Sequence, residues 1–243
     1  INICFKLQKN KKHIFIKRIN VVKIMNKVLV VLPAFNEGKV IADVIKSIKK
    51  EGYKDILVID DCSKDNTSQI AKKEGAIVLR HVINRGAGAA TYTGITYAKK
   101  NNYDYVVLID SDGQHDPKDI KKLMKKTNKF DVVIGSRMFN SKGMPVSRKI
   151  LNFGGSLITA FFFGIYVRDS QSGFKILNKK AINKIKIHFD RYEFCSEILS
   201  EIHRNRLTFT EVPIKVIYTD HSLSKGQSLT NGFKMLIRFI FRA

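Results

Sequence analysis

Residues 106–117 read VVLIDSDGQHDP, an apolar run that breaks into two aspartates one residue apart. A continuous apolar run of this length is typical of a strand that is covered on both faces of a sheet. Asp116 and Pro117 then give a strong helix-start signal, with Asp116 as the N-cap and Pro117 at the first helical position. The stretch therefore predicts a buried strand over 105–109, a polar loop, and a helix over 117–126.

The same alternation of strand and helix extends to both sides of this stretch. Residues 28–32 form another unbroken apolar run, and the helix that Asn36 opens has its apolar residues at the 3.6-residue period. Further strands are predicted over 56–59, 76–79 and 132–135, and further helices over 63–74 and 86–100. Strands that alternate with helices of this length predict an α/β fold with a mostly parallel central sheet and helices on both faces.

After Arg137 the rhythm changes. We expect an apolar helix over about 148–165, a short segment DSQSGFKIL, a helix near 192–204, an alternating strand over 208–218 and an amphipathic tail over 231–242. The expected organisation is a flexible basic extension (1–24), one domain (25–228) whose halves meet at residues 137 and 138, and an amphipathic C-terminal helix (229–243).

The chain is strongly basic, with 44 Lys+Arg against 21 Asp+Glu and a formal net charge of +23. Residues 1–24 hold seven of these basic residues and no acid, which leaves 37 against 21, or +16, for the rest. Such a surplus indicates an anionic partner: nucleic acid, anionic lipid or a phosphorylated substrate. The three cysteines form no CxxC pair, which favours free thiols in a reducing compartment and no structural zinc.

Residues 1–24 lack the uninterrupted apolar core of a signal peptide, so we expect none there. The most apolar stretch, ILNFGGSLITAFFFGIYV (150–167), contains Asn, Ser, Thr and three glycines. We expect it to be a buried or membrane-contacting helix and not a spanning one.

Polar residues follow four of the predicted strands, at the edge of the sheet where α/β proteins bind ligands. They are the stretch 33–37 (PAFNE), the pair Asp60-Asp61, the run Asp110-Ser111-Asp112 and the pair Ser136-Arg137. Asp110 and Asp112 are one residue apart, so an extended backbone would point both carboxylates the same way. Two such carboxylates predict a Mg²⁺ or Mn²⁺ site completed by substrate phosphates. An EF-hand is excluded, because the loop lacks its glycine and its glutamate.

The glycine-rich stretch NRGAGAATYTG (84–94) is neither a GxGxxG fingerprint after the first strand nor a P-loop. It allows either a close approach of the backbone to a ligand or a tight contact between helix and sheet. His115 and His221 lie beside the candidate loops, where solvated histidines are the more common case.

Seven motifs carry a resemblance to a known family: PAFNE (33–37), VIDDCSKDNT (58–67), NRGAGAATYTG (84–94), DSDGQHDP (110–117), GSR (135–137), DSQSGFK (169–175) and YTDHSLSKGQS (218–228). In order and spacing they resemble glycosyltransferase family 2, and within it the dolichol-phosphate mannosyltransferase-type enzymes. The resemblance implies a GT-A fold and a membrane-associated transferase of glycan biosynthesis that uses a nucleoside-diphosphate sugar (GDP- or UDP-linked). The halves 25–137 and 138–228 would then serve the nucleotide sugar and the acceptor.

The same resemblance implies roles for individual residues. The nucleotide sugar would be bound by Pro33, Phe35, Glu37, Ile59, Asp60, Asp61, Ser111, Gln114 and Lys225. Asp110 and Asp112 would hold the metal, and with Arg137, which would contact the phosphates, they form the expected catalytic set. Asp169 and Ser172 are candidates for the acceptor side.

The expected reaction is the inverting transfer of mannose or glucose to a dolichyl or undecaprenyl phosphate at the cytoplasmic face of the membrane, by a peripheral enzyme. A lipid phosphate is already ionised near neutral pH, since its second pKa is about 6, so it needs no general base. Elongation of a lipid-linked glycan or polysaccharide, transfer of glucose or an N-acetylhexosamine, and a catalytically silent phosphate-binding module are alternatives. A basic nucleic-acid-binding protein is a further alternative, but we expect no nucleic acid, because no aromatic-interleaved RNA motif is present.

Overall fold

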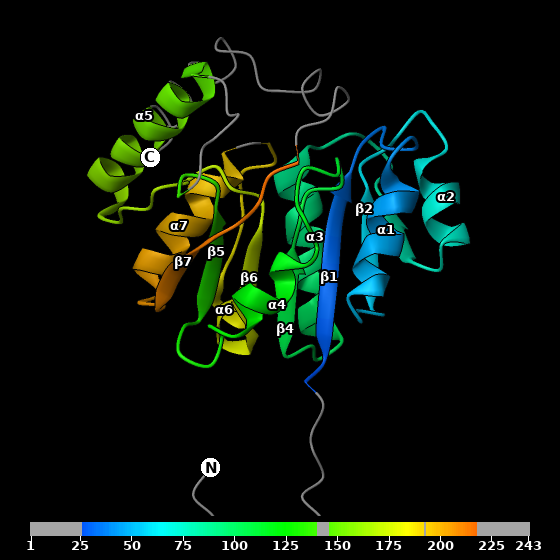
Figure 1. The fold of residues 1–243 in the computed structure, drawn as a ribbon, viewed down its shortest axis with the longest axis horizontal. Coiled ribbons are helices and arrows are strands. Elements are labelled where there is room, and N and C mark those ends of the chain that lie inside the picture. Colours follow the sequence, from blue (N-terminus) through cyan, green and yellow to red (C-terminus); the bar gives the residue numbers. More distant parts are fainter. Residues whose placement is uncertain (1–25, 140–145, 192, 218–243) are drawn as a thin grey trace, which may run out of the picture.

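A seven-stranded sheet with the strand order β3-β2-β1-β4-β6-β5-β7 forms the centre of the molecule (Figure 1). The computed structural model describes residues 26–139, 146–191 and 193–217. Within these ranges the strands are β1 (Val28–Ala34), β2 (Ile56–Asp60), β3 (Ile77–Arg80), β4 (Tyr105–Leu108), β5 (Val132–Ser136), β6 (Lys175–Asn178) and β7 (Phe209–Pro213). All five strands predicted up to residue 137 are present.

The sheet is mostly parallel, as the alternation of strands and helices predicted. The pairs β1–β2, β1–β4, β2–β3 and β5–β7 are parallel. The exception is β6, which lies antiparallel between β4 and β5 and pairs Leu177 with both Val106 and Val132. The sequence predicts only a short segment over 169–177, so β6 is an element that the pattern does not mark.

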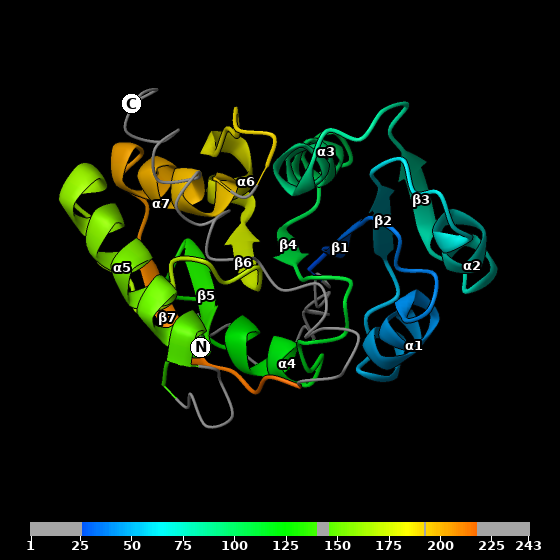
Figure 2. The same cartoon turned by 90° about the horizontal axis from the view of Figure 1, so that it is seen from above.

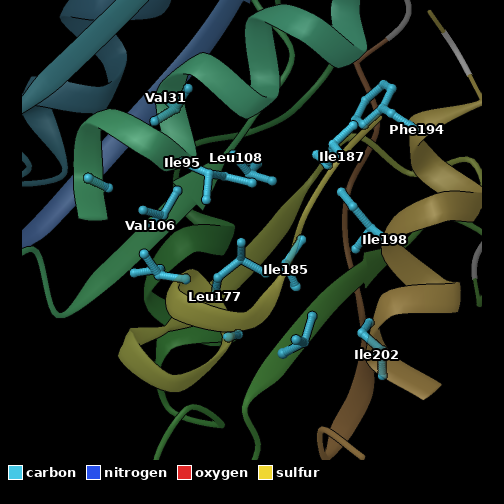
Figure 3. Packing of buried hydrophobic residues seen from close by; sticks show 14 of the residues in the cluster. Val31, Ile95, Val106, Leu108, Leu177, Ile185, Ile187, Phe194, Ile198 and Ile202 are labelled. Carbon is cyan, nitrogen blue, oxygen red and sulfur yellow. The ribbon is translucent and has the colours of Figure 1, made fainter. Parts of the chain in front are cut away.

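Helices cover both faces of the sheet (Figure 2). The described helices are α1 (Ile41–Lys50), α2 (Thr67–Lys73), α3 (Ala87–Lys100), α4 (Asp119–Met124), α5 (Val146–Phe163), α6 (Lys179–Lys184) and α7 (Phe194–Arg204). One apolar cluster joins α3, α6 and α7 to residues such as Val31 and Leu108 (Figure 3). The other joins α1, α2 and α4 to the opposite face, through residues such as Val30 and Val107. Alternate residues of each strand therefore serve opposite layers.

Helices α1 and α2 begin five and four residues later than predicted, because polar side chains hold the chain in turns after the strands. Asn36 has a left-handed backbone (φ 56°), and α1 begins only at Ile41. Before α2, the side chains of Asp60 and Asp65 accept the backbone N–H groups of Ser63 and Thr67. Such local bonds compete with helical geometry.

Asp116 does accept the N–H of Lys118 at 3.0 Å, as expected of a cap, although the α-helix itself begins at Asp119.

The remaining differences lie in the second half. α6 was not predicted; it is short, and the Asn178 side chain caps it by accepting the N–H of Ala181. β7 ends at Pro213, and between there and residue 217, where the described residues end, an isolated bridge joins Val216 to His115. The expected extension (1–24), Lys225, His221 and the C-terminal helix lie outside the described residues. In the part of the chain that the structure describes, no helix has both the length and the apolar content to cross a bilayer.

Candidate functional site

The paired acids of the DSD motif lie just beyond the end of β4. β4 ends at Leu108, and Ser111 and Asp112 already belong to a turn, so the extended-backbone argument for their orientation was wrong. The turn is fixed instead by hydrogen bonds. The Ser111 hydroxyl donates to the Pro33 carbonyl at 2.6 Å, and Gln114 donates to the two oxygens of Asp112 from its backbone (3.0 Å) and its side chain (2.6 Å).

Asp110 is held by a buried histidine. His115 Nε2 lies 3.0 Å from Asp110 Oδ2, and because an ionised carboxylate only accepts, Nε2 carries the hydrogen. The His115 side chain is 2% exposed and packs on the Phe174 ring at 5.3 Å between centroids. The expectation of a solvated loop histidine was therefore wrong. The Asp110 side chain itself remains 47% exposed, so it is open to a ligand.

The two acids differ in their electrostatic surroundings. Burial acts to raise the pKa of Asp110, but the hydrogen bond from His115 and the charges of Arg137 and Lys175 lower it below its usual range. The pKa of Asp112 is raised by burial and by the negative charge of Asp110. The negative charges of the two carboxylates therefore repel each other, and a bound cation would weaken this repulsion.

This donor set fits a divalent metal ion such as Mg²⁺ or Mn²⁺. Carboxylate oxygens are the ligands that these ions prefer, and one or two protein carboxylates with substrate phosphates are a usual shell. Within the described ranges no group of three or more His, Cys, Asp or Glu side chains could hold an ion by itself. Asp110 and Asp112 would therefore hold the metal together with ligands from the substrate.

A turn from the second half of the chain closes on Asp110. A Cβ atom built on Gly173 would lie 2.2 Å from Asp110 Oδ1 and 2.3 Å from Oδ2. No real side chain tolerates such distances, so only glycine lets the turn approach the carboxylate this closely. The DSQSGFK motif thus forms one wall of the acidic pair.

Arg137 forms a buried ion pair with Asp169, which lies in the same turn. Arg137 donates to the Asp169 carboxylate from its backbone N–H (2.9 Å), from Nε (2.7 Å) and from Nη2 (2.6 Å). The Asp169 side chain is 0% exposed and that of Arg137 18%. Burial alone would oppose both charges, but each partner stabilises the other, so the pKa of Asp169 is lowered and the pKa of Arg137 is raised.

Lys175 adds a second positive charge behind the site. It is 1% exposed, and its Nζ donates to the carbonyl of Ser172 within the same turn. Its charge also contributes to lowering the pKa values of Asp110 and Asp169. Ser172 is fully buried, and its hydroxyl accepts the N–H of Phe174 at 3.3 Å.

The two aspartates at the end of β2 have their hydrogen bonds satisfied within the protein. Asp60 is fully buried and accepts from the Ser63 N–H and the Ser68 hydroxyl. Asp61 accepts from His81 Nδ1 (2.7 Å) and from the backbone N–H groups of Arg85 (3.0 Å) and Gly86 (2.6 Å). Both therefore shape the loops around the carboxyl edge.

The other residues expected to bind the nucleotide sugar lie at this edge or just below it. Phe35 is 41% exposed, whereas Glu37 is buried and its backbone N–H donates to the Thr67 hydroxyl at 2.9 Å. The Ile59 side chain lies wholly in the apolar core. A base could therefore contact Phe35 directly.

The glycine-rich stretch makes tight contacts within the protein. A Cβ on Gly94 would lie 2.3 Å from the Val31 side chain, which is the helix–sheet contact that sequence analysis left open. Cβ atoms on Gly86 and Gly88 would lie 2.4 Å and 2.1 Å from the carbonyl oxygens of Asp190 and Phe189. These glycines seat the loop after α6 against α3.

Among the side chains of helix α5 that the structure describes, polar ones lie inward and apolar ones outward. Asn152, Ser156 and Thr159 are buried, and a Cβ on Gly155 would lie 3.2 Å from the Ser170 hydroxyl. Ile150, Phe153 and Leu157 are 66%, 56% and 49% exposed. A helix at the surface of a water-soluble protein shows the opposite pattern. The helix lies at the β7 edge of the sheet, beside α7 (Figures 1 and 2).

Sequence reasoning missed four residues that build this site and its surroundings. His115 was dismissed, although its place directly after Gln114 in DGQHDP was a signal. Lys175 carried a signal too. A lysine within the apolar run FKIL indicates a buried positive charge that interacts with a partner in the interior. Gly173 and His81 gave no local signal, because their partners Asp110 and Asp61 are distant in the sequence.

Comparison with known proteins agrees with this architecture. The model of the family described as Glycosyl transferase family 2 matches residues 29–186. The UDP-N-acetylglucosamine–dolichyl-phosphate N-acetylglucosaminyltransferase of Methanococcus voltae is 36% identical, over 88% of this chain and 94% of that protein. The undecaprenyl-phosphate mannosyltransferase of Micrococcus luteus is 28% identical, over 82% of this chain and 87% of that protein.

A solved structure shows the same fold. Glucosyl-3-phosphoglycerate synthase from Mycobacterium tuberculosis, crystallised with Mn²⁺, uridine diphosphate and glucosyl-3-phosphoglycerate, superposes with a TM-score of 0.66 at 20% identity and covers 88% of this chain and 77% of that one. The fold is therefore GT-A, as the sequence motifs implied. The family match spans most of the sheet, the acidic pair and the turn that closes on it, and it makes the chain a glycosyltransferase of family 2.

Proposed function

We propose that this glycosyltransferase transfers a sugar from a nucleoside-diphosphate sugar to a polyprenyl phosphate at a membrane surface, with inversion of the anomeric centre. The observation that carries the proposal is the placement of Asp110, Asp112 and Arg137 at one edge of the sheet. The acids suit an ion on a diphosphate, and the guanidinium suits phosphate oxygens. The names of the relatives from Methanococcus and Micrococcus support a polyprenyl phosphate as the acceptor.

The donor side follows from the acidic pair. A divalent ion on Asp110 and Asp112 would act as a Lewis acid that offsets the charge developing on the departing diphosphate. His115 and Gln114 hold these two carboxylates in place through hydrogen bonds to their oxygens. Phe35 offers an exposed aromatic face to the base. The name of the Methanococcus relative specifies N-acetylglucosamine as the transferred sugar, so this N-acetylhexosamine is a candidate besides mannose and glucose.

The acceptor side needs no general base. A phosphate monoester is largely dianionic at neutral pH, since its second pKa is about 6. One of its oxygens forms the bond to the anomeric carbon while the bond from that carbon to the diphosphate breaks, and the electron pair leaves with the diphosphate. Arg137 contributes fixed positive charge beside these oxygens, and Asp169 and Ser172 shape the turn next to it.

Two features support a membrane surface as the place of reaction. The outward apolar side of α5 can enter the interface between lipid headgroups and acyl chains. The net charge of +23 favours anionic lipid, at about 1 kcal/mol for each basic residue near the surface. Peripheral attachment on the cytoplasmic side, where nucleotide sugars and anionic leaflets meet, is part of this proposal.

The experiment is a transfer assay with a panel of donors. Purified protein with Mn²⁺ is incubated with UDP-N-acetylglucosamine, UDP-glucose or GDP-mannose and with undecaprenyl or dolichyl phosphate. We expect a lipid-linked monosaccharide from one donor, and none in the presence of a chelator.

Two controls separate the alternatives. Polyprenyl alcohol in place of the phosphate should give no product, because its hydroxyl is neither ionised nor opposite a base. Product formed only on a preassembled lipid-linked glycan would instead show an elongating enzyme and contradict the proposal.

A further inference from the structure

The buried pair of Arg137 and Asp169 leaves only part of the guanidinium available. A guanidinium has five N–H donors in one plane. Asp169 takes the Nε donor and one from Nη2, at 2.7 Å and 2.6 Å. The edge formed by Nη1 and the second Nη2 hydrogen is turned away from Asp169 by the planar geometry. Nη1 has no hydrogen-bond partner among the described residues.

Arg137 and the acidic pair follow β5 and β4, the two strands that flank β6. Lys175 at the start of β6 pairs with Leu108, two residues before Asp110, and with Ile134, three residues before Arg137, so both groups follow strands that end beside the same end of β6. The Arg137 side chain is 18% exposed, so a ligand reaches it from solvent. Two parallel N–H groups match two oxygens of a phosphate.

Asp169 is itself held firmly. The carboxylate of Glu211 on β7 accepts the backbone N–H groups of Arg168 (2.9 Å) and Asp169 (3.2 Å). On the other side, Lys175 Nζ donates to the Ser172 carbonyl, and Gly173 lies against Asp110. The turn therefore sets the position of Asp169 relative to both Arg137 and the acidic pair.

We propose that Asp169 is a positioning residue. It fixes the guanidinium of Arg137 so that the Nη1/Nη2 edge of the guanidinium donates hydrogen bonds to a substrate phosphate beside Asp110. Asp169 then acts through Arg137 and does not contact the acceptor itself, which differs from the role implied by the family resemblance. The inference rests on the proposed function only in taking the ligand to be a phosphate, of the donor diphosphate or of the acceptor.

The test is a double-mutant cycle of binding constants on the full chain. The proteins are wild type, Asp169→Asn, Arg137→Gln and the double variant Arg137→Gln/Asp169→Asn. The probes are UDP or GDP with Mn²⁺ for the donor phosphates, and farnesyl phosphate for the acceptor phosphate. Dissociation constants are measured at a temperature at which circular dichroism shows every protein to be folded.

We expect one of the two probes to bind roughly 10–100-fold more weakly to each single variant, because charge-assisted hydrogen bonds to it are lost or misaligned. The affected probe identifies which phosphate Arg137 binds, and the dissociation constant of the other probe changes less than about twofold. The double variant binds no more weakly than Arg137→Gln, because Asp169 has no other route to the ligand.

Asp169→Asn leaves a buried guanidinium without its counter-charge and can fail to fold. The double variant removes both charges, so its comparison with Arg137→Gln alone still decides the question. Further weakening on adding Asp169→Asn would show a direct contact and overturn the proposal. Wild-type binding of both probes by folded Asp169→Asn would overturn it as well.

A matched control loosens the same turn without touching Arg137. The Ser156 hydroxyl on α5 donates to the Arg168 carbonyl at 3.3 Å, and Ser156→Ala removes this bond. We expect unchanged binding of both probes by this variant; a loss equal to that of Asp169→Asn would show a general effect of the turn and contradict the proposal. Because the readout is binding, absence of sugar transfer by the wild type would count against the proposed function alone.

Discussion

Gly173 determines how close the second half of the chain comes to the acidic pair. In Gly173→Ala the new methyl group would lie 2.2–2.4 Å from the carboxylate of Asp110, so the carboxylate or the turn must move. We expect sugar transfer to fall about 10²-fold, since a displacement near 1 Å in an active site has this effect. Weaker binding of Mn²⁺, measured by titration, should accompany the loss.

Gly154→Ala is the matched control for this substitution. Gly154 lies in α5, and a Cβ there meets nothing within 4 Å. Alanine should therefore raise the melting temperature slightly, since it is favoured over glycine in a helix by up to about 1 kcal/mol. Full activity of Gly173→Ala would mean that Asp110 is not placed by this contact.

Asp112 should matter for the reaction and not for the fold. Asp112→Ala is expected to lower sugar transfer by roughly 10²–10³-fold, because it would remove a carboxylate that we propose as a ligand of the metal ion. The thermal unfolding curve should stay near that of the wild type, since burial and the charge of Asp110 already disfavour the ionised carboxylate.

Asp116→Asn in the same loop is the control, because asparagine accepts the Lys118 N–H as aspartate does. It should retain full activity. Equal activity of Asp112→Ala and the control would remove the metal role of the pair.

The acids of the site were accessible to sequence reasoning, whereas their surroundings were not. Asp110 and Asp112 were found because two carboxylates follow an apolar strand. Their orientation was misjudged, since the chain leaves the strand before Asp110. The contact of His115 with Asp110 depends on a loop, and that of Gly173 with Asp110 on a pairing 63 residues away in the chain; local patterns do not encode either.

At the scale of the elements, Asp131 links three strands and a helix. It lies at the start of β5, and its carboxylate accepts from Lys180 Nζ (2.8 Å), Asn178 Nδ2 (3.0 Å) and the Thr208 N–H (2.9 Å). Burial would raise its pKa, but these hydrogen bonds lower it to about 2. The depressed pKa means that Asp131 stabilises the fold above the unfolded pKa of about 4, and that this contribution is lost as the pH falls towards 2.

Asp131→Asn should therefore lower the free energy of unfolding by about 2 kcal/mol at pH 7 and by much less near pH 2. Urea unfolding of both proteins at several pH values measures this difference. A difference that stays the same from pH 7 to pH 2 would contradict the assignment. Lys179→Ala on the same helix is the control, because Lys179 pairs with Asp104 and not with Asp131.

Helix α5 is expected to bind lipid through its outward side. Phe153→Ser and Leu157→Ser remove apolar surface that is already exposed, so the fold should persist. Each should weaken binding to vesicles that contain phosphatidylglycerol by about tenfold or more, from the roughly 1.5–3 kcal/mol of burying such a side chain. Cosedimentation measures the change.

Ile77→Ser serves as the control, since Ile77 is 40% exposed but lies on β3, at the opposite edge of the sheet. It should bind vesicles as the wild type does. Equal weakening by all three substitutions would indicate a nonspecific effect, and no weakening by any would place the lipid contact elsewhere.

Elements with a clear period or an unbroken apolar run were predicted well, whereas β6 and α6 were not predicted. The apolar run of β1 and the 3.6-residue pattern of α1 predicted both elements. β6 has four residues and a lysine at its start, so neither alternation nor an apolar run marks it. α6 has six residues, and its capping by Asn178 became visible only in the structure.

For the whole molecule, the charge of +23 predicts that attachment to membranes depends on salt. The Debye length is about 8 Å at 0.15 M and about 3 Å at 1 M ionic strength. Binding to anionic vesicles should therefore weaken strongly between these conditions. The residual binding at 1 M salt should be the part that Leu157→Ser reduces, because the apolar contribution is not screened. Vesicles of phosphatidylcholine alone should bind weakly at both salt concentrations.

The fold class could be predicted because it depends on the order of elements, which the sequence displays directly. Five strands alternating with helices fixed a mostly parallel sheet with two covering layers. The insertion of β6 between β4 and β5 could not be predicted, because strand order depends on which residues meet across the chain. The pairing of Arg137 with Asp169 escaped prediction for the same reason.

The place of β6 also has a consequence for how the protein is made. As the chain leaves the ribosome, β1 to β4 can pair among themselves in parallel, but β5 has no neighbour in the sheet until residues 175–178 have been synthesised. Asp169 and Gly173 are synthesised directly before that same strand. A nascent chain therefore acquires four strands of its sheet before the wall of the acidic pair exists, and β6 supplies that wall and connects β5 to the sheet, which β7 then completes.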